Sequence, residues 1–180
     1  MFSIILATRD SERALVPTLA ALVPGATAGI VREVIIADGG SRDQTEGVAD
    51  IAGCVFLQSA EPLGARLSAA ARRARSDWLM FLQPRAVPAF TWIDESIAFT
   101  EKAQIDVRAA VFADEPSVLA AFRRTFLLPR PRQGLMLRKS IYQKIGGHRA
   151  DAADPELALI RQIGRSRLTA LRTPVSFPDI

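Results

Sequence analysis

Cysteine and histidine are almost absent from this sequence of 180 residues, which contains only Cys54 and His148. A single cysteine cannot form an internal disulfide, and one cysteine with one histidine gives no cluster with the ligand spacing of a structural zinc site. The same scarcity excludes most hydrolases built on a histidine base, because His148 would have to serve in every such arrangement. We therefore expect neither a zinc protein nor a hydrolase of this kind.

Lysine and long apolar runs are also scarce. Only three of the 23 basic residues are lysines, which leaves 20 arginines against 19 acids and a net charge of +4. The acids are interleaved with the arginines, and no basic stripe with aromatic residues occurs, so nucleic acid is not an expected partner. No stretch approaches the roughly 20 apolar residues needed to cross a bilayer, and no basic leader precedes the first apolar run. We expect a cytoplasmic protein without a transmembrane segment.

The apolar runs are short, rich in isoleucine and valine, and separated by helix-length segments. This pattern predicts one α/β domain over residues 1–180, with a mostly parallel central sheet flanked by helices. The expected first helix starts after Ser11, which is placed to cap it, and ends at Pro24-Gly25. The other expected elements are strands at 2–6, 34–37, 55–57, 78–82, 107–112, 134–137 and 168–171, and helices at 43–52, 64–75, 92–102, 116–126, 140–145 and 155–163.

The clearest candidate site is the turn Asp38-Gly39-Gly40-Ser41, which follows an apolar strand and precedes a helix. A carboxylate at the carboxyl end of a strand can accept hydrogen bonds from a base or a ribose, and glycines let the backbone approach a ligand. The alternative is an ordinary turn in which Ser41 or Asp43 caps the helix. Neither G-x-G-x-x-G nor a P-loop occurs, which argues against two common kinds of nucleotide site.

The expected helix at 116–126 is amphipathic and runs into a segment rich in arginine and proline at 127–132. One interpretation is a solvated helix face followed by a turn. The other is a basic, apolar lip that meets an anionic or lipid-linked substrate at the inner face of a membrane.

Five segments, in order, resemble family 2 glycosyltransferases of the GT-A fold, and most closely their short soluble subgroup without membrane helices. They are residues 2–12, 32–45, 64–82, 133–147 and 153–157. The resemblance implies a single Rossmann-like nucleotide-diphospho-sugar transferase domain. It also implies that residues 1–88 form the half that binds the nucleotide sugar and residues 89–180 form the acceptor-side half.

The resemblance further implies roles in donor binding. Thr8 and Arg9 stand where the family holds the nucleobase, and Asp38 matches its base-reading aspartate. The Gly39-Gly40-Ser41 turn belongs to the same site. Arg66 lies at a helix start, where its charge and the helix N-terminus favour a diphosphate.

On the acceptor side, the resemblance makes Asp154 the general base that takes a proton from the acceptor hydroxyl. Glu156 is an alternative carboxylate for this role. A purely structural alternative is that Asp154 caps the helix that begins at Pro155.

The sequence departs from the family after the fourth expected strand. Where these transferases carry an acidic motif for a divalent cation, this chain has Gln83-Pro84-Arg85 and no carboxylate up to Pro88. We therefore expect no metal site and no required cofactor, with Arg85 supplying positive charge to the leaving diphosphate. The expected function is transfer of a sugar from a nucleotide sugar to an unknown acceptor with inversion. The alternative is an inactive relative that binds a nucleotide, a nucleotide sugar or a protein partner.

Overall fold

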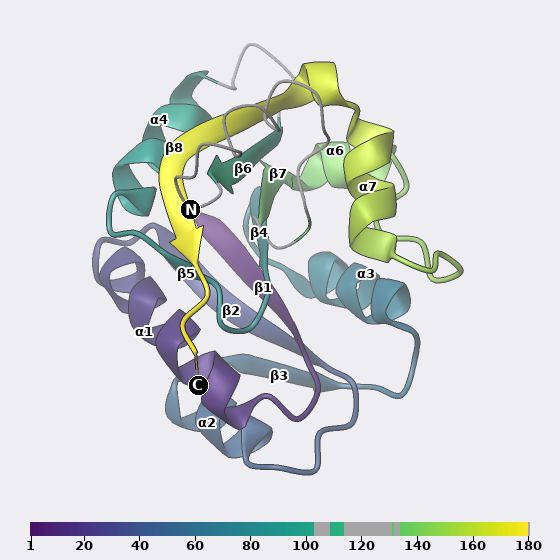
Figure 1. The fold of residues 1–180 in the computed structure, drawn as a ribbon. Coiled ribbons are helices and arrows are strands. Elements are labelled where there is room, and N and C mark those ends of the chain that lie inside the picture. The colour runs from purple at the N-terminus through teal and green to yellow at the C-terminus, as the bar shows by residue number, and fades with distance from the viewer. Residues whose placement is uncertain (103–108, 114–130, 132–133, 180) are drawn as a thin grey trace.

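The fold was analysed in a computed structural model, which describes residues 1–102, 109–113, 131 and 134–179 (Figure 1). An eight-stranded sheet in the described residues has the order β3-β2-β1-β4-β7-β6-β8-β5. Its strands are β1 (Phe2–Thr8), β2 (Val31–Asp38), β3 (Val55–Gln58), β4 (Trp78–Leu82), β5 (Val87–Pro88), β6 (Ala109–Ala113), β7 (Leu135–Arg138) and β8 (Leu168–Ser176). Nearly every residue of β1 and β4 is buried, which explains their unbroken apolar runs.

Helices cover both faces of the sheet (Figure 1). Side chains from α1, α2 and α4 pack with one face of β1 and β4 in one core cluster, and those from α3, α6 and α7 pack with the other face in a second. The helices are α1 (Glu12–Thr27), α2 (Thr45–Ile51), α3 (Leu63–Arg73), α4 (Trp92–Lys102), α6 (Lys139–Lys144) and α7 (Pro155–Ile163), with a short 3-10 helix η2 (Arg165–Arg167). No helix in this described part of the chain is long and apolar enough to cross a membrane.

The expected mostly parallel sheet is wrong, because the sheet is mixed. Strands β3, β2, β1 and β4 are parallel, as are β6 and β8, but β7 runs antiparallel to both β4 and β6, and β5 runs antiparallel to β8. The residues of β7 carry no signal for direction, since a short buried strand has the same apolar composition in either orientation.

The first helix does not end at Pro24-Gly25 as expected, and it continues to Thr27. Tertiary packing explains the difference. The Trp92 indole lies so close to Gly25 that an added Cβ would be 2.4 Å from the ring, and its Nε1 donates to the Ala21 carbonyl at 3.2 Å. Contacts with α4 thus keep the chain helical past a proline that lacks an amide donor. Ser11 occupies the N-cap position, but its hydroxyl donates to the Arg9 carbonyl and does not cap the helix.

The expected elements at 78–82, 92–102 and 155–163 are confirmed with the same bounds, and most others differ by one to a few residues. The expected helix at 116–126, the lip at 127–132 and the start of the strand at 107–112 lie outside the described residues, apart from Pro131.

Candidate functional site

The carboxyl ends of β1, β2 and β4 lie at one edge of the sheet, because these three strands are parallel neighbours. Thr8 pairs in register with Asp38, and Leu6 pairs with Leu82, which immediately precedes Gln83. The side chains expected to bind the donor therefore gather where three strands end. In an open α/β sheet this is the edge at which ligands bind.

Asp38 is fully buried and accepts hydrogen bonds on both carboxylate oxygens. Its Oδ2 accepts from the amides of Gly40 and Ser41, each at 2.8 Å, and from Gln58 Nε2 at 3.4 Å. Its Oδ1 accepts from the Thr8 hydroxyl at 2.8 Å and from the Ser41 hydroxyl. Burial alone would raise the pKa of Asp38, but the bonds from Ser41, Thr8 and Gly40 outweigh it and lower the pKa to about 2. Asp38 therefore stays negatively charged at neutral pH, and its hydrogen bonds hold the 39–41 turn in place.

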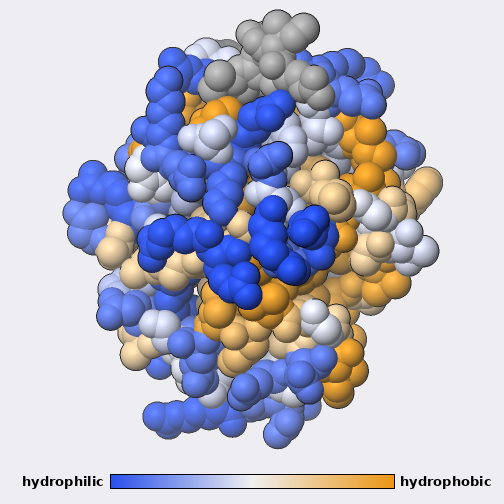
Figure 2. All heavy atoms as spheres, turned by 180° about the vertical axis from the view of Figure 1, so that it is seen from behind, coloured by the Kyte–Doolittle hydropathy of each residue, from blue (hydrophilic) through white to orange (hydrophobic). Residues whose placement is uncertain are grey.

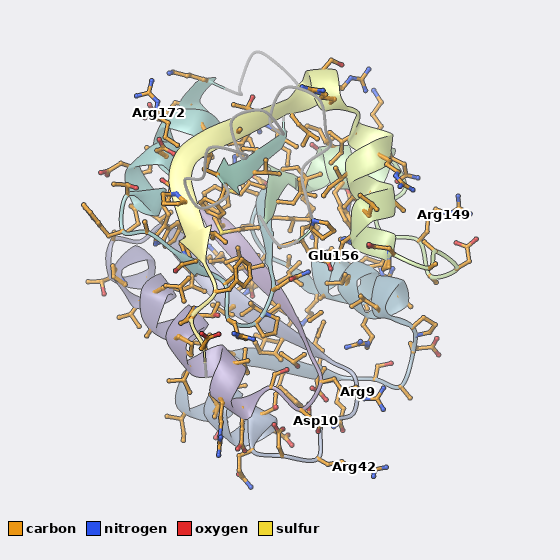
Figure 3. All side chains as sticks on the ribbon, in the orientation of Figure 1. Arg9, Asp10, Arg42, Arg149, Glu156 and Arg172 are labelled. Atoms are coloured by element: carbon orange, nitrogen blue, oxygen red, sulfur yellow. The ribbon has the colours of Figure 1, made fainter. Side chains whose placement is uncertain are left out.

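The loops that follow β1 and β2 are joined by reciprocal hydrogen bonds. The Asp10 carboxylate accepts from the Arg42 amide at 2.8 Å, and the Asp10 amide donates to the Ser41 hydroxyl at 2.8 Å. Next along the loops, the Glu12 amide donates to Asp43 at 3.0 Å, while the Glu12 carboxylate accepts from the Gln44 amide at 2.9 Å. Asp10, at φ 48°, is one of two non-glycine residues of the described chain in the left-handed region. The two loops thus form one preformed unit (Figure 3).

Arg66 extends from the first turn of α3 across the ends of β1 and β2. Its Nη1 donates to the carbonyls of Ala37 at 2.6 Å and Thr8 at 3.2 Å, and its Nε donates to Glu61 O at 3.2 Å. The guanidinium lies against Gly39, where an added Cβ would be 2.9 Å from Arg66 Cζ. Burial lowers the pKa of Arg66, the charge of Asp38 raises it, and the nearby charge of Arg9 lowers it again. A guanidinium stays protonated in proteins, so Arg9 and Arg66 each keep a positive charge beside the charged Asp38.

Glu156, at the start of α7, reaches the same edge beside β4. Gln83 Nε2 donates to Glu156 Oε2 at 3.2 Å, although the two residues are 73 positions apart. Burial raises the pKa of Glu156, the bond from Gln83 lowers it, and the charge of Asp154 raises it, for a net increase. Glu156 extends from the start of α7 toward the sheet, whereas Arg149 in the preceding loop extends outward (Figure 3).

Asp154 is exposed and caps α7, with its Oδ1 accepting from the Leu157 amide at 2.8 Å. The alternative in which Asp154 caps the helix that begins at Pro155 is therefore confirmed. The sequence made Glu156 only the alternative general base, and it did not predict the contact between Glu156 and Gln83. No local pattern signals that contact, because it depends on how α7 packs against β4.

Arg85 directs its guanidinium to the C-terminal segment of the chain. Its Nε and Nη2 donate to the Pro178 carbonyl at 3.2 and 2.8 Å, and Nη2 lies 3.6 Å from the exposed Asp179 carboxylate. The structure thus brings Thr8, Asp38, the 39–41 turn and Arg66 together, with Arg9 beside them. Asp154 and Glu156 lie near the carboxyl end of the neighbouring strand β4, and Arg85 contacts residues 178–179.

His148, the only histidine, belongs to the core beneath this edge. It is 4% exposed, its Nδ1 lies 2.9 Å from the Tyr142 hydroxyl, and its ring packs edge-on against Phe81. Burial lowers the pKa of His148 to about 4, so the ring is neutral at physiological pH.

The mixed sheet between two helical layers, with a polar site at the ends of its parallel strands, is similar to the fold of solved GT-A glycosyltransferases. Residues 3–156 match the model of the family described as "Glycosyl transferase family 2", and the chain belongs to this family. A search of curated proteins found no match.

Solved glycosyltransferase structures share the fold at low identity. Glucosyl-3-phosphoglycerate synthase from Mycobacterium tuberculosis, in complex with Mn²⁺, UDP and glucosyl-3-phosphoglycerate, has a TM-score of 0.75 at 15% identity, covering 100% of this chain and 72% of that one. The mannosyltransferase PcManGT from Pyrobaculum calidifontis, with GDP-Man and Mn²⁺, has a TM-score of 0.75 at 15% identity, covering 96% and 54%. TarS from S. aureus has a TM-score of 0.71 at 16% identity, covering 96% and 59%.

Two of these structures contain Mn²⁺, but the residues at this edge of the present chain do not fit a divalent cation. Such ions need several hard oxygen ligands. The segment after β4 offers Gln83, whose amide nitrogen faces Glu156, and the cationic Arg85. No group of three or more histidine, cysteine, aspartate or glutamate side chains able to hold a metal occurs in the described part of the chain.

Proposed function

We propose that this chain transfers a sugar from a nucleoside-diphosphate sugar to an acceptor hydroxyl, with inversion at the anomeric carbon and without a required divalent cation. The proposal rests on the arrangement of side chains at the carboxyl edge of the sheet, in a chain that belongs to family 2. There, a charged Asp38 fixes a preformed turn, Arg66 lies across it, and Glu156 faces the next strand end. Residues 1–88 bind the donor in this proposal, and residues 89–180 form the acceptor side.

Donor binding is assigned to the two linked loops and α3. Thr8 and Arg9 contact the nucleobase, and Asp38 holds the turn whose backbone approaches the nucleoside. Arg66 binds the diphosphate, since a guanidinium matches phosphate oxygens and the N-terminus of α3 adds positive potential. The UDP and GDP-Man complexes of the structural relatives support a nucleotide donor.

Chemistry is assigned to the carboxylates of α7. The acceptor oxygen forms a bond to the anomeric carbon while the bond from that carbon to the diphosphate oxygen breaks, and the diphosphate leaves with the electron pair. The acceptor proton passes to Glu156, whose raised pKa brings it closer to neutral pH than an ordinary carboxylate. Asp154 caps α7 and contributes negative charge that raises the pKa of Glu156.

Arginine replaces the cation at the leaving group in this proposal. Arg66 contacts the diphosphate from one side, and Arg85 supplies a second charge from the position after β4. The present bonds of Arg85 are to a backbone carbonyl and, at 3.6 Å, to an exposed carboxylate. A diphosphate offers Arg85 more negative charge than these partners, so it can displace them.

The acceptor is proposed to be anionic or lipid-linked, with the protein peripheral to the inner face of a membrane. The phosphoglyceric acid bound to the mycobacterial relative supports an anionic acceptor. The arginine-rich segment at 127–132 supports attraction to such a molecule.

A second candidate function is binding of a nucleotide sugar without turnover. The observation that favours it is the absence of any carboxylate from residues 83–88, since a divalent cation stabilises a leaving diphosphate more strongly than a guanidinium does.

Hydrolysis of UDP-, GDP- and dTDP-sugars, in which water takes the place of the acceptor and the nucleoside diphosphate is released, tests the proposal. We expect wild-type protein to release the diphosphate in EDTA, and Glu156→Gln to lose at least about 100-fold in kcat while binding the donor unchanged. Asp154→Asn is the matched control, because asparagine still caps α7, and it should lose less than about tenfold in kcat.

Full activity of Glu156→Gln would refute the role of Glu156 as the base. An inactive Asp154→Asn with an active Glu156→Gln would assign that role to Asp154. No release by wild type from any donor, with binding retained, would favour the second candidate.

A further inference from the structure

A cavity lies at the opposite edge of the sheet from the donor site. It has a volume of about 450 Å³ and is lined by residues at the amino ends of β1, β2 and β4, the carboxyl end of β7, and α4. The lining residues are Met1, Arg32, Arg75, Ser76, Asp77, Trp78, Thr100 and Arg138. Because β7 runs antiparallel to β4, Arg138 pairs in register with Trp78 and comes to this edge.

Three guanidinium groups line this amino-edge pocket. The side chain of Arg32 has no hydrogen bond or ion pair with any described residue. The guanidinium of Arg138 lies over the Trp78 ring, 4.7 Å from its centroid. Arg75 bonds Glu33 through Nε at 2.8 Å, and its side chain is 54% exposed. Figure 2, which shows the rear of the molecule, has strongly hydrophilic side chains gathered near the middle of that face, beside an apolar area.

The acids around the pocket do not neutralise these arginines. Glu33 already accepts from the Ser3 hydroxyl at 2.7 Å, from the Arg75 amide at 2.6 Å and from Arg75 Nε. Burial raises the pKa of Glu33, but these bonds lower it overall, so Glu33 stays charged and offsets Arg75. Asp77 is the acid in the pocket lining, and it is exposed. Three arginines against Glu33 and Asp77 therefore leave a net positive charge.

A buried hydroxyl in the same pocket lacks a partner. Ser76 is 6% exposed, and its Oγ is the one buried side-chain nitrogen or oxygen of the described residues without a hydrogen bond. Its amide is satisfied by the Ser3 hydroxyl at 3.1 Å, so only the hydroxyl is orphaned. An unsatisfied buried hydroxyl destabilises the free protein, and a ligand that accepts a hydrogen bond from Ser76 would remove this cost.

We propose that the amino-edge pocket binds the phosphate group of a small phosphorylated molecule, at a site separate from the donor site. Guanidinium groups pair with phosphate oxygens through parallel N–H bonds, and a hydroxyl donor completes such a set. Trp78 and the stem of Arg138 form an apolar wall for the organic part of the ligand. The inference does not rest on the transferase activity, because it uses none of the donor-site residues.

Titration of the full chain with inorganic phosphate in chloride buffer tests the site, followed through the two tryptophan indole resonances. We expect saturable binding that shifts the Trp78 resonance and leaves that of Trp92, which is buried under α1, unchanged. Arg32→Gln should weaken binding at least about tenfold, because one charge-assisted pair is lost and Arg32 has no structural partner to lose. Ser76→Ala should weaken binding while leaving the stability of the free protein unchanged or higher, since its hydroxyl is unpaired.

Two controls separate this site from others. Asp38→Ala alters the donor site and should leave phosphate binding at the Trp78 pocket intact. Arg172→Gln removes an exposed arginine on β8 that does not line the pocket, and it should also leave phosphate binding intact. The proposal is overturned if phosphate causes no Trp78 shift at millimolar concentration. It is equally overturned if Asp38→Ala abolishes the binding, or if Arg172→Gln weakens it as much as Arg32→Gln does.

Discussion

At the scale of the residue, two buried ionisable side chains are held in opposite charge states. Asp38 is kept charged because its turn and Thr8 donate hydrogen bonds to both oxygens, which lowers its pKa to about 2. His148 is kept neutral because its surroundings, the rings of Phe81 and Tyr142, cannot solvate an imidazolium. The first arrangement prepares a ligand site, and the second stabilises the core beneath it.

His148 makes stability depend on pH in a defined window. Its pKa is lowered from 6.5 to about 4, so the unfolded chain binds a proton more readily than the folded one between these values. The His148 contribution is complete above pH 6.5 and is lost as pH falls toward 4, by on the order of 3 kcal/mol. His148→Phe should therefore flatten this part of the profile, measured by urea unfolding from pH 4 to pH 7.5.

Phenylalanine keeps an aromatic ring against Phe81 and leaves the bond from the residue 148 amide to the Tyr142 hydroxyl in place. The comparison thus isolates the titration of the imidazole. Equal pH dependence in the two proteins would show that His148 is not the group responsible.

At the scale of the element, α3 joins the donor loops to the loop that precedes α7. Gly64, at the start of α3, packs so closely that an added Cβ would lie 2.1 Å from the Arg149 carbonyl oxygen. The same helix carries Arg66, which bonds the ends of β1 and β2. The position of α3 therefore determines how the donor residues and the α7 carboxylates face each other.

Gly64→Ala should lower the free energy of unfolding by about 1–3 kcal/mol, because the backbone of residue 149 must move. Gly47→Ala in α2 is the matched control: its added Cβ would meet only the Gln44 side chain, at 3.1 Å, and alanine favours a helix. Chemical denaturation measures both. A Gly64→Ala protein as stable as wild type would mean that this contact does not position α3.

Element positions were largely predictable where apolar runs are bounded by turn residues, as in β4, α4 and α7. The end of α1 was not, since Trp92 packs on Gly25 from a distant part of the sequence. Strand direction in the second half was not predictable either, and β5, with two residues, is too short to give a pattern. Within the candidate site, the Asp38 turn was predicted from its position after an apolar strand, and Arg66 was predicted from the family resemblance. The contact between Gln83 and Glu156 depends on the tertiary fold, so no sequence pattern indicated it.

At the scale of the whole molecule, the sheet has a charged site at each edge. The carboxyl edge carries the candidate donor site, and the amino edge carries an arginine-lined pocket with an orphaned hydroxyl. In a chain with 20 arginines and three lysines, planar guanidinium groups supply the positive charge at both places. Arginine is thus the residue type through which this protein is proposed to recognise phosphate.

The central claim is that this family 2 chain binds a nucleotide sugar through arginine in place of a divalent cation. Isothermal titration with UDP, GDP, dTDP and their sugar conjugates, each in EDTA and in excess Mn²⁺, tests it most directly. We predict binding with equal affinity in both conditions, weakened at least about tenfold by Arg66→Ala, by Arg85→Ala and by Asp38→Ala. Binding that requires Mn²⁺, or no binding of any nucleotide in either condition, would contradict the claim.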